Sequence, residues 1–480
     1  MKRLLCMILT GLMLFCAACT AAPGTQRAEA PAEATEQPYP SDEANFVPDV
    51  PVETEAPIEL QPIENPPIQP GDSIENPPIE LTDPIQPVYD LMGNMPEVSG
   101  YADFSALLSA TLLSGKQNRN LSPISVYLAM AMAAEGANGE TLEELLQLLG
   151  CRSLEELRGT CAAMLETLSI DEENSTLDLH NSIWMADQIG GEPVQFREDY
   201  LFTLGKAYRS EANTVDFGSF TAGQQIAEWI TEQTRGKIKI SPDAMHFDPE
   251  TLAVLINTIY LKDGWSDPFN MQLTEHGNFD GLNADTGETE QIVVDYINRS
   301  DRNVIIVQGD GWLRYRVYLN RVGYVSFVLP DEGIALERLL GSPEAIDKLL
   351  HAGINKTCNI SLKIPKFSFQ DKMELDGVLR SLGLARCFTP DADFSGMTDI
   401  PAKIDRVLQE SYIGVDENGV EAAAYTMVAV KAAGIFNPVE LETIEFHLTR
   451  PFLYTIESYD GTVLFIGTVT APNAAEQIHK

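Results

Sequence analysis

Two groups of residues in this chain have the types and spacing that reactive chemistry requires. Cys16 and Cys19 form a C-x-x-C pair, a spacing used by redox and metal sites. Asp171, Glu172 and Glu173 place three carboxylates side by side. However, the cysteine pair lies where a signal segment is expected to be cleaved, and in a chain of net charge −39 the acids are expected to form a solvated surface turn. We assign a catalytic role to neither group.

The rest of the sequence predicts a protein that is not an enzyme. No G-x-S-x-G elbow, H-E-x-x-H motif or phosphate-binding glycine loop occurs, and the six histidines are scattered from His180 to His479. The net charge argues against nucleic acid as a partner, because phosphate binding needs clustered Lys and Arg. We expect no cofactor and no metal site, and we expect buried free thiols at the four widely spaced cysteines Cys151, Cys161, Cys358 and Cys387.

The most informative stretch is Glu417–Thr426, with the sequence ENGVEAAAYT. It resembles the hinge of the reactive-centre loop of an inhibitory serpin; the matching positions are Glu417, Gly419, Val420, Glu421, Ala422, Ala423, Ala424 and Thr426. Seven further segments resemble serpin motifs in the family's order: Asn120–Val126, Val215–Phe217, Asn257–Trp265, Leu329–Gly333, Ile364–Phe367, Ala392–Gly396 and Arg450–Leu453. The resemblance implies an α+β serpin fold with three β-sheets, about nine helices and an exposed reactive-centre loop.

The order of side chains that begins at Val420 is compatible with insertion of this segment into a β-sheet, in which alternate residues face inward and outward. With Val420 facing inward, the residues that also face inward are Ala422, Ala424, Thr426, Val428 and Val430. Glu421, Tyr425 and Lys431 then face outward, so both charges stay out of the core. The alternative is that Glu421–Ala424 begins an ordinary helix, since Ala and Glu are good helix formers.

Five residues outside the hinge are expected to control the insertion of the reactive-centre loop into the sheet. Ser122, Ser125 and Asn257 match the serpin shutter, in which polar side chains close the sheet until the loop arrives. Trp265 matches the aromatic residue at the breach, where insertion begins. Gln409 occupies the place of a histidine common in the family, and since an amide can both donate and accept, the shutter network can persist with altered geometry.

The resemblance implies a suicide-substrate inhibitor that forms a covalent complex with its target, with serine proteases as the first class of target and cysteine proteases as the second. Counting from the hinge glutamate places the reactive bond at Ala433–Gly434, which suits elastase-like or subtilisin-like pockets. The competing bond is Lys431–Ala432, which suits trypsin-like enzymes. Because the distance from Ala433 to Pro451 is unusually long for the family, either the loop is longer than usual on that side or the bond is displaced toward Phe436 or Glu440. The alternative function is that of a non-inhibitory serpin acting as a surface binding protein.

The elements that must position these residues can be predicted from local patterns. Helices are expected after the Ser122–Pro123 N-cap, after a Thr141/Glu144 capping box and up to Gly150, and around Trp229. Strands are expected at Leu252–Leu261, Tyr324–Leu329, Ile360–Ile364 and Leu464–Val469. Because helices come early and strands late, the pattern favours α+β over a parallel α/β sheet.

The first residues predict export and anchoring. Lys2 and Arg3 precede an apolar run, and small residues precede Cys19, as in a bacterial lipobox, although Cys16 stands where Leu is usual. We expect a signal peptide at 1–18, an acidic Pro-rich linker at 19–94, a serpin domain at 95–474 and a tail at 475–480. From Thr20 to Asp90 the linker has fifteen of the 29 prolines, a composition that favours an extended spacer of up to about 200 Å. The chain is thus expected to be a monomeric lipoprotein on the outer side of a bacterial membrane.

Lipidation at Cys19 is directly testable. Replacing the thiol removes the only atom that can carry the lipid, so Cys19→Ala should lose labelling by radioactive palmitate and leave the membrane fraction. Cys16→Leu, which restores the residue usual at that place, should keep both. A Cys19→Ala variant that is labelled and membrane-bound like the parent would rule out the anchor.

Overall fold

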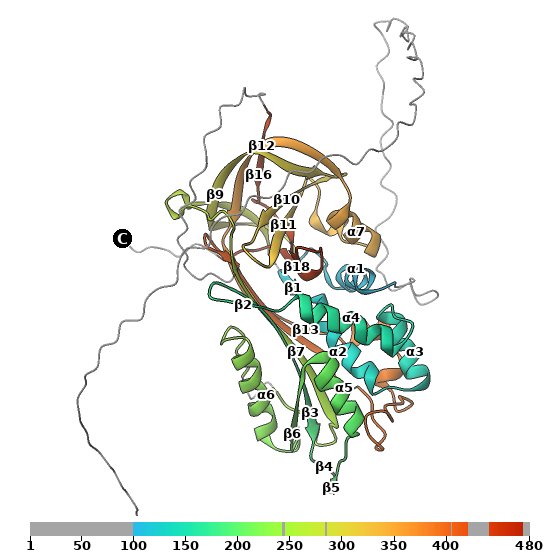
Figure 1. Ribbon diagram of the computed structural model, residues 1–480. Coiled ribbons are helices and arrows are strands. Elements are labelled where there is room, and N and C mark those ends of the chain that lie inside the picture. The colour runs from blue at the N-terminus through green and yellow to red at the C-terminus, as the bar shows by residue number, and fades with distance from the viewer. Residues whose placement is uncertain (1–98, 242–244, 284–285, 405, 421–440, 474–480) are drawn as a thin grey trace, which may run out of the picture. The chain divides into compact units, whose positions relative to one another are not determined.

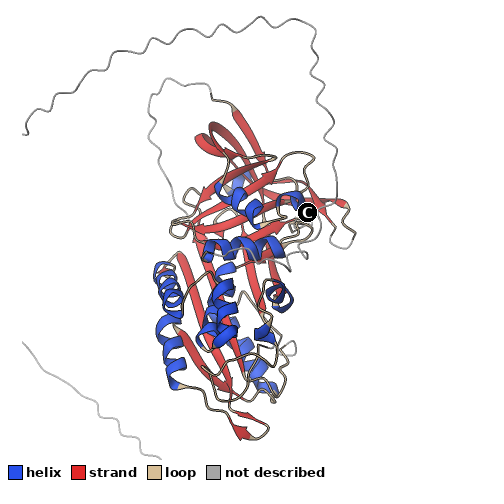
Figure 2. Cartoon of the chain, turned by 90° about the vertical axis from the view of Figure 1, so that its right-hand side faces the viewer, coloured by secondary structure: helices blue, strands red, loops and turns tan. Residues whose placement is uncertain are grey.

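The computed structural model describes residues 99–473, apart from 242–244, 284–285, 405 and 421–440. Within these residues the chain forms eight α-helices and three sheets, as expected for an α+β serpin fold (Figures 1 and 2). The helices are α1 (Tyr101–Leu112), α2 (Pro123–Glu135), α3 (Gly139–Leu148), α4 (Leu154–Thr167), α5 (Glu198–Tyr208), α6 (Phe220–Gln233), α7 (Pro343–His351) and α8 (Asp376–Ser381).

A seven-stranded sheet occupies the lower part of Figure 1, with α2 on one face and α6 on the other. Its strand order is β13-β14-β15-β7-β3-β2, with β6 paired to β3. The bounds are β13 Phe367–Glu374, β14 Leu408–Val415, β15 Gly419–Val420, β7 Ala253–Gly264, β3 Ser175–Ala186, β2 Ile170–Glu172 and β6 Ser210–Val215. The centre of this sheet therefore contains a strand of only two described residues.

A nine-stranded sheet forms the upper part of the same body. Its order is β1-β18-β17-β11-β10-β9-β12-β16, with β8 paired to β9. The bounds are β1 Arg119–Leu121, β18 Val463–Val469, β17 Phe452–Ser458, β11 Gly323–Pro330, β10 Trp312–Tyr318, β9 Thr289–Gln308, β12 Ile354–Pro365, β16 Thr443–His447 and β8 Glu275–Leu282. β4 (Gln188–Ile189) and β5 (Glu192–Pro193) form the third, two-stranded sheet.

Helix α2 is buried on every side, as its almost wholly apolar sequence predicts. It begins at Pro123 after the N-cap Ser122, so the proline occupies a position where its missing N–H removes no helical hydrogen bond. Because α2 packs in the large hydrophobic core beneath the seven-stranded sheet, it holds Ser122 and Ser125 against that sheet.

The predicted Thr141/Glu144 capping box is wrong. Helix α3 begins earlier, with Asn138 as its N-cap. Thr141 Oγ1 instead accepts a hydrogen bond from the Asp393 N–H at 2.9 Å, and Glu144 Oε2 accepts one from the Arg386 N–H at 2.9 Å. The side-chain oxygens of Thr141 and Glu144 therefore accept hydrogen bonds from distant backbone groups and do not cap the helix. The predicted stop at Gly150 is confirmed by its left-handed backbone, with φ of 66°.

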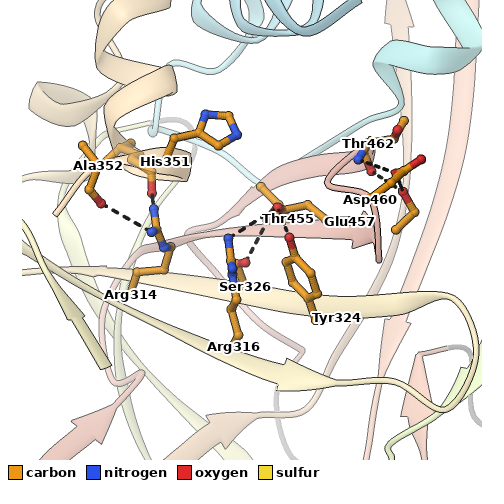
Figure 3. A network of polar contacts seen from close by, with 12 residues as sticks. Arg314, Arg316, Tyr324, Ser326, His351, Ala352, Thr455, Glu457, Asp460 and Thr462 are labelled. Atoms are coloured by element: carbon orange, nitrogen blue, oxygen red, sulfur yellow. Dashed lines mark hydrogen bonds and ion pairs between the residues drawn. The ribbon is translucent and has the colours of Figure 1, made fainter. Parts of the chain in front are cut away.

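A buried polar network fixes the C-terminus of α7 to the nine-stranded sheet (Figure 3). The Arg314 guanidinium donates to the carbonyls of Leu349 and Ala352, which are among the last carbonyls of that helix. Burial, together with the charge of Arg316, lowers the pKa of Arg314 to about 10. Tyr324 and Ser326 each donate to the Glu457 carboxylate at 2.9 Å. Since both charged groups have hydrogen-bond partners, the network is structural.

Two further expectations concern thiols and membrane contact. Cys151, Cys161, Cys358 and Cys387 are free, as predicted, although Cys151 is only half-buried. Burial raises the pKa of each of these thiols, which keeps them protonated and unreactive. Among the helices of the described part of the chain, none combines the length and apolar character needed to cross a bilayer.

Candidate functional site

The site is built around β15, the short strand between β14 and β7. Gly419 and Val420 pair with Gly264 and Asp263 of β7, and Val420 also pairs with Val415 of β14. A Cβ on Gly419 would collide with the Asp263 carbonyl, so glycine permits this close approach of two backbones. Val420 is 3% exposed and faces the core, which agrees with the inward register predicted for it.

Trp265 anchors the chain that leads into β15. Its indole Nε1 donates to the Asp416 carbonyl at 2.8 Å, and its backbone N–H donates to the Asn418 carbonyl at 2.9 Å. The ring is 1% exposed and makes an edge contact with Phe269. The expected breach residue therefore holds both ends of the turn before the hinge strand.

Glu417, the hinge glutamate, is a buried charge with two partners. Its carboxylate accepts from Thr274 Oγ1 at 2.7 Å and forms an ion pair with Lys366 Nζ at 3.1 Å. Burial alone raises the pKa of Glu417, but the hydrogen bonds from Thr274 and the backbone and the charge of Lys366 outweigh it, so the pKa lies below its usual value. Burial raises the pKa of the adjacent Asp416.

Below β15 the two central strands separate. Within the residues that the structure describes, β7 and β14 are linked only through β15 and have no ladder with each other. A cavity of about 390 Å³ occupies the gap. Its walls come from β7, β14, α2 and α6, and it reaches both faces of the sheet.

Three of the shutter residues, Ser125, Asn257 and Gln409, line this cavity. The Ser122 and Ser125 hydroxyls are 3.0 Å apart, and Gln409 binds the backbone of Ser122 by accepting from its N–H at 3.1 Å and donating to its carbonyl at 2.7 Å. Gln409 thus fills the place of the expected histidine with two hydrogen bonds. Asn257 lies on the β7 wall and donates from Nδ2 to Asn181 Oδ1 at 2.8 Å.

Asn257 Oδ1 has no hydrogen-bond partner among the described residues, and the same is true of Thr258 Oγ1 on the same strand. Both residues line the cavity. Unsatisfied buried polar atoms cost free energy, and they are rare in folded proteins. Both atoms lie where β7 and β14 have no ladder with each other among the described residues.

Three site residues had no predicted role. Lys366 and Thr274 hold Glu417, and Asn181 holds Asn257. Lys366 was within a segment that resembles the family, but no local pattern connects it to a carboxylate 51 positions away. Of the predicted residues, Glu421–Thr426 and the two proposed bonds, Lys431–Ala432 and Ala433–Gly434, lie outside the described residues.

A protein-family model described as "Serpin (serine protease inhibitor)" matches residues 99–472. The chain belongs to the serpin family. It is 31% identical over 393 residues to an uncharacterized serpin-like protein of Thermococcus kodakarensis, covering 78% of this chain and 86% of that one. It is 29% identical over 370 residues to serine protease inhibitor 42Dd of Drosophila melanogaster, covering 74% and 92%.

Solved serpin structures agree with this assignment. The native state of tengpin, a thermophilic serpin, is 28% identical with a TM-score of 0.66 over 80% of this chain and 99% of that one. Its latent state gives 0.63 at 25% identity, over 78% and 97%. Membership of the serpin family supports protease inhibition in general, and serpins are generally inhibitors of proteases rather than catalysts.

The hinge ion pair of this serpin should control its stability in a pH-dependent way. In Lys366→Met the buried Glu417 carboxylate keeps its charge but loses its cation, which should lower the free energy of unfolding by about 2 kcal/mol at pH 7. Because the folded pKa of Glu417 lies below the unfolded value, the contribution of the pair is present above the unfolded pKa and is lost as pH falls through the folded one.

Urea denaturation at several pH values measures the difference between parent and variant. That difference should be largest at neutral pH and shrink below pH of about 4. Glu417→Gln, which removes the charge but keeps a hydrogen-bond acceptor for Thr274, is the matched control and should cost less than Lys366→Met. A Lys366→Met variant as stable as the parent at pH 7 would show that the ion pair contributes nothing.

Proposed function

We propose that this serpin is a suicide-substrate inhibitor of serine proteases, with cysteine proteases as a further possible class of target. The protease nucleophile attacks the carbonyl of the reactive bond, the peptide C–N bond breaks, and the new amine leaves with a proton. The acyl-enzyme ester then remains on the N-terminal side of the cut. Insertion of the released loop between β7 and β14 carries the trapped enzyme along and distorts it before water can cleave the ester.

The observation that carries this proposal is the gap below β15. The hinge strand already bridges β14 and β7 at one end of that gap, while the strands beyond it have no ladder with each other among the described residues. Each inserted residue can add hydrogen bonds worth about 0.5 to 1.5 kcal/mol net. A dozen residues could therefore supply on the order of 10 kcal/mol, enough to make insertion irreversible.

Extending the observed register gives a concrete inserted state. Continuing the antiparallel pairing of Val420 with Asp263 brings Thr426 opposite Asn257 on β7, and continuing the pairing with Val415 brings Thr426 opposite Gln409 on β14. A small hydroxyl would thus arrive between the two shutter walls, beside the unpartnered Asn257 Oδ1. On the opposite face Glu421 would lie across from Lys262, a favourable cross-strand pair.

The bond that we assign is Ala433–Gly434, and small residues there favour elastase-like or subtilisin-like targets. Lys431–Ala432 is the competing bond, which a trypsin-like enzyme would cut. We further propose that the chain acts as a monomer on the cell surface, lipid-anchored through Cys19 to a bacterial membrane. The acidic linker would then hold the reactive loop clear of the lipid and within reach of extracellular proteases.

The direct test is incubation of the purified protein with a panel of elastase-like, subtilisin-like, trypsin-like and cysteine proteases. An inhibitor gives a complex that survives SDS, and mass spectrometry of the released peptide should find Gly434 at its N-terminus; a peptide starting at Ala432 would select the competing bond. If no protease forms a complex, and intact and loop-nicked proteins melt at the same temperature, the protein is a non-inhibitory surface binding serpin.

Thr426→Arg tests the inserted register. An inward guanidinium between Asn257 and Gln409 would have to be buried without a counter-charge, at a cost of several kcal/mol. Insertion should stall there, so the variant should be cut as a substrate without a stable complex. Thr426→Val, which has nearly the same volume and no charge, is the control and should still inhibit. Full inhibition by Thr426→Arg would show that residue 426 faces outward.

A further inference from the structure

The gap between β7 and β14 also has the composition of a ligand pocket. Its volume of about 390 Å³ lies within the range of about 300 to 1,000 Å³ typical of small-molecule sites, which are mostly apolar with a few polar groups. Its inner walls are apolar: Val126 and Met130 come from α2, Ile226 and Ile230 from α6, and Leu255 from β7. An alkyl chain in this space would be removed from water on all of these sides.

The rim of the cavity has three basic and two acidic side chains, although the chain has a net charge of −39. Lys372, Lys403 and Arg406 line it on the β13–β14 side, together with the acids Asp248 and Glu410. Glu410 is neutralised by Lys372 at 3.2 Å, and the Asp248 carboxylate accepts from the Glu250 N–H at 2.9 Å.

Arg406 is exposed and makes no hydrogen bond or ion pair with any residue in the described part of the chain. An exposed guanidinium without such partners can bind a carboxylate through two parallel hydrogen bonds. An anion at the rim would thus meet a cation that no residue in the described part of the chain neutralises.

We propose that this cavity binds a free long-chain carboxylate, with its alkyl chain between the strands and its carboxylate at Arg406. Apolar walls select the chain, and Arg406 at the rim selects the sign of the head group. Each methylene that the cavity removes from water should raise the affinity about fourfold, so affinity should rise with chain length until the cavity is filled.

Binding would also oppose inhibition, and this consequence rests on the proposed function. The chain would occupy the space that the loop enters, so the carboxylate and the inserted loop exclude each other. Saturating ligand should slow insertion and shift the outcome from trapped complex to cleaved substrate.

The test is calorimetric titration of the full chain with sodium dodecanoate below its micelle concentration, beside dodecyltrimethylammonium, which has the same alkyl chain and the opposite charge. Dodecanoate should bind about tenfold or more tightly than the cation, since a hydrogen bond between charged groups contributes about 1.5 to 3 kcal/mol. Arg406→Glu should lose about tenfold in affinity. Arg302→Glu, an exposed arginine on β9 away from the cavity, is the matched control and should bind like the parent.

Loop-nicked protein separates the two proposals. If the loop inserts, nicked protein should not bind dodecanoate, while intact protein should. Absence of binding to intact protein, equal binding of the two amphiphiles, or unchanged binding by Arg406→Glu would each overturn the ligand site whatever the proteases do. Binding to intact and nicked protein alike would also overturn the site if SDS-stable complexes form. If intact and nicked protein bind dodecanoate equally and no protease forms an SDS-stable complex, the ligand site is supported and loop insertion is ruled out.

Discussion

Among the described residues, the two halves of the seven-stranded sheet are connected only through Gly419 and Val420. The other features of the site depend on this short connection. Among the described residues, β7 and β14 share only this two-residue partner, so below it they have no backbone ladder with each other, and two polar side-chain atoms of β7 lack hydrogen-bond partners. These atoms are Asn257 Oδ1 and Thr258 Oγ1. In the proposed mechanism, a complete strand that fills this gap lowers the free energy of the folded protein.

The surrounding residues hold this unfilled arrangement in place. Trp265 fixes the turn before β15, and Lys366 and Thr274 hold Glu417 where the chain enters the sheet. A buried ion pair contributes little net stability, because desolvation offsets much of its Coulomb energy. Its effect here is positional, since a charged group with fixed partners resists movement of the hinge. The two hydrogen bonds between the Gln409 side chain and the backbone of Ser122 likewise hold β14 in place.

The proposed loop insertion and the proposed carboxylate site both use the gap between β7 and β14. A strand and an alkyl chain make different use of it: a strand supplies hydrogen bonds to β7 and β14, whereas an alkyl chain supplies only apolar contact. The strand therefore gains more free energy, and a ligand could delay insertion without abolishing it. Occupancy would depend on ligand concentration, whereas insertion after cleavage is intramolecular and does not.

The sequence by itself determined the features that depend on local pattern. The apolar run of α2 predicted a helix in the core, and Gly150 predicted the end of α3. Val420 is buried, as the register with Val420 inward requires, whereas the residues expected to alternate with it lie outside the described part of the chain. Only the tertiary structure decided which distant groups meet. Thr141 bonds to Asp393 rather than to a local cap, Glu417 pairs with Lys366, and Asn257 with Asn181. The gap itself is a relation between β7 and β14, about 150 positions apart, and short-range periodicity carries no information on whether two such strands pair.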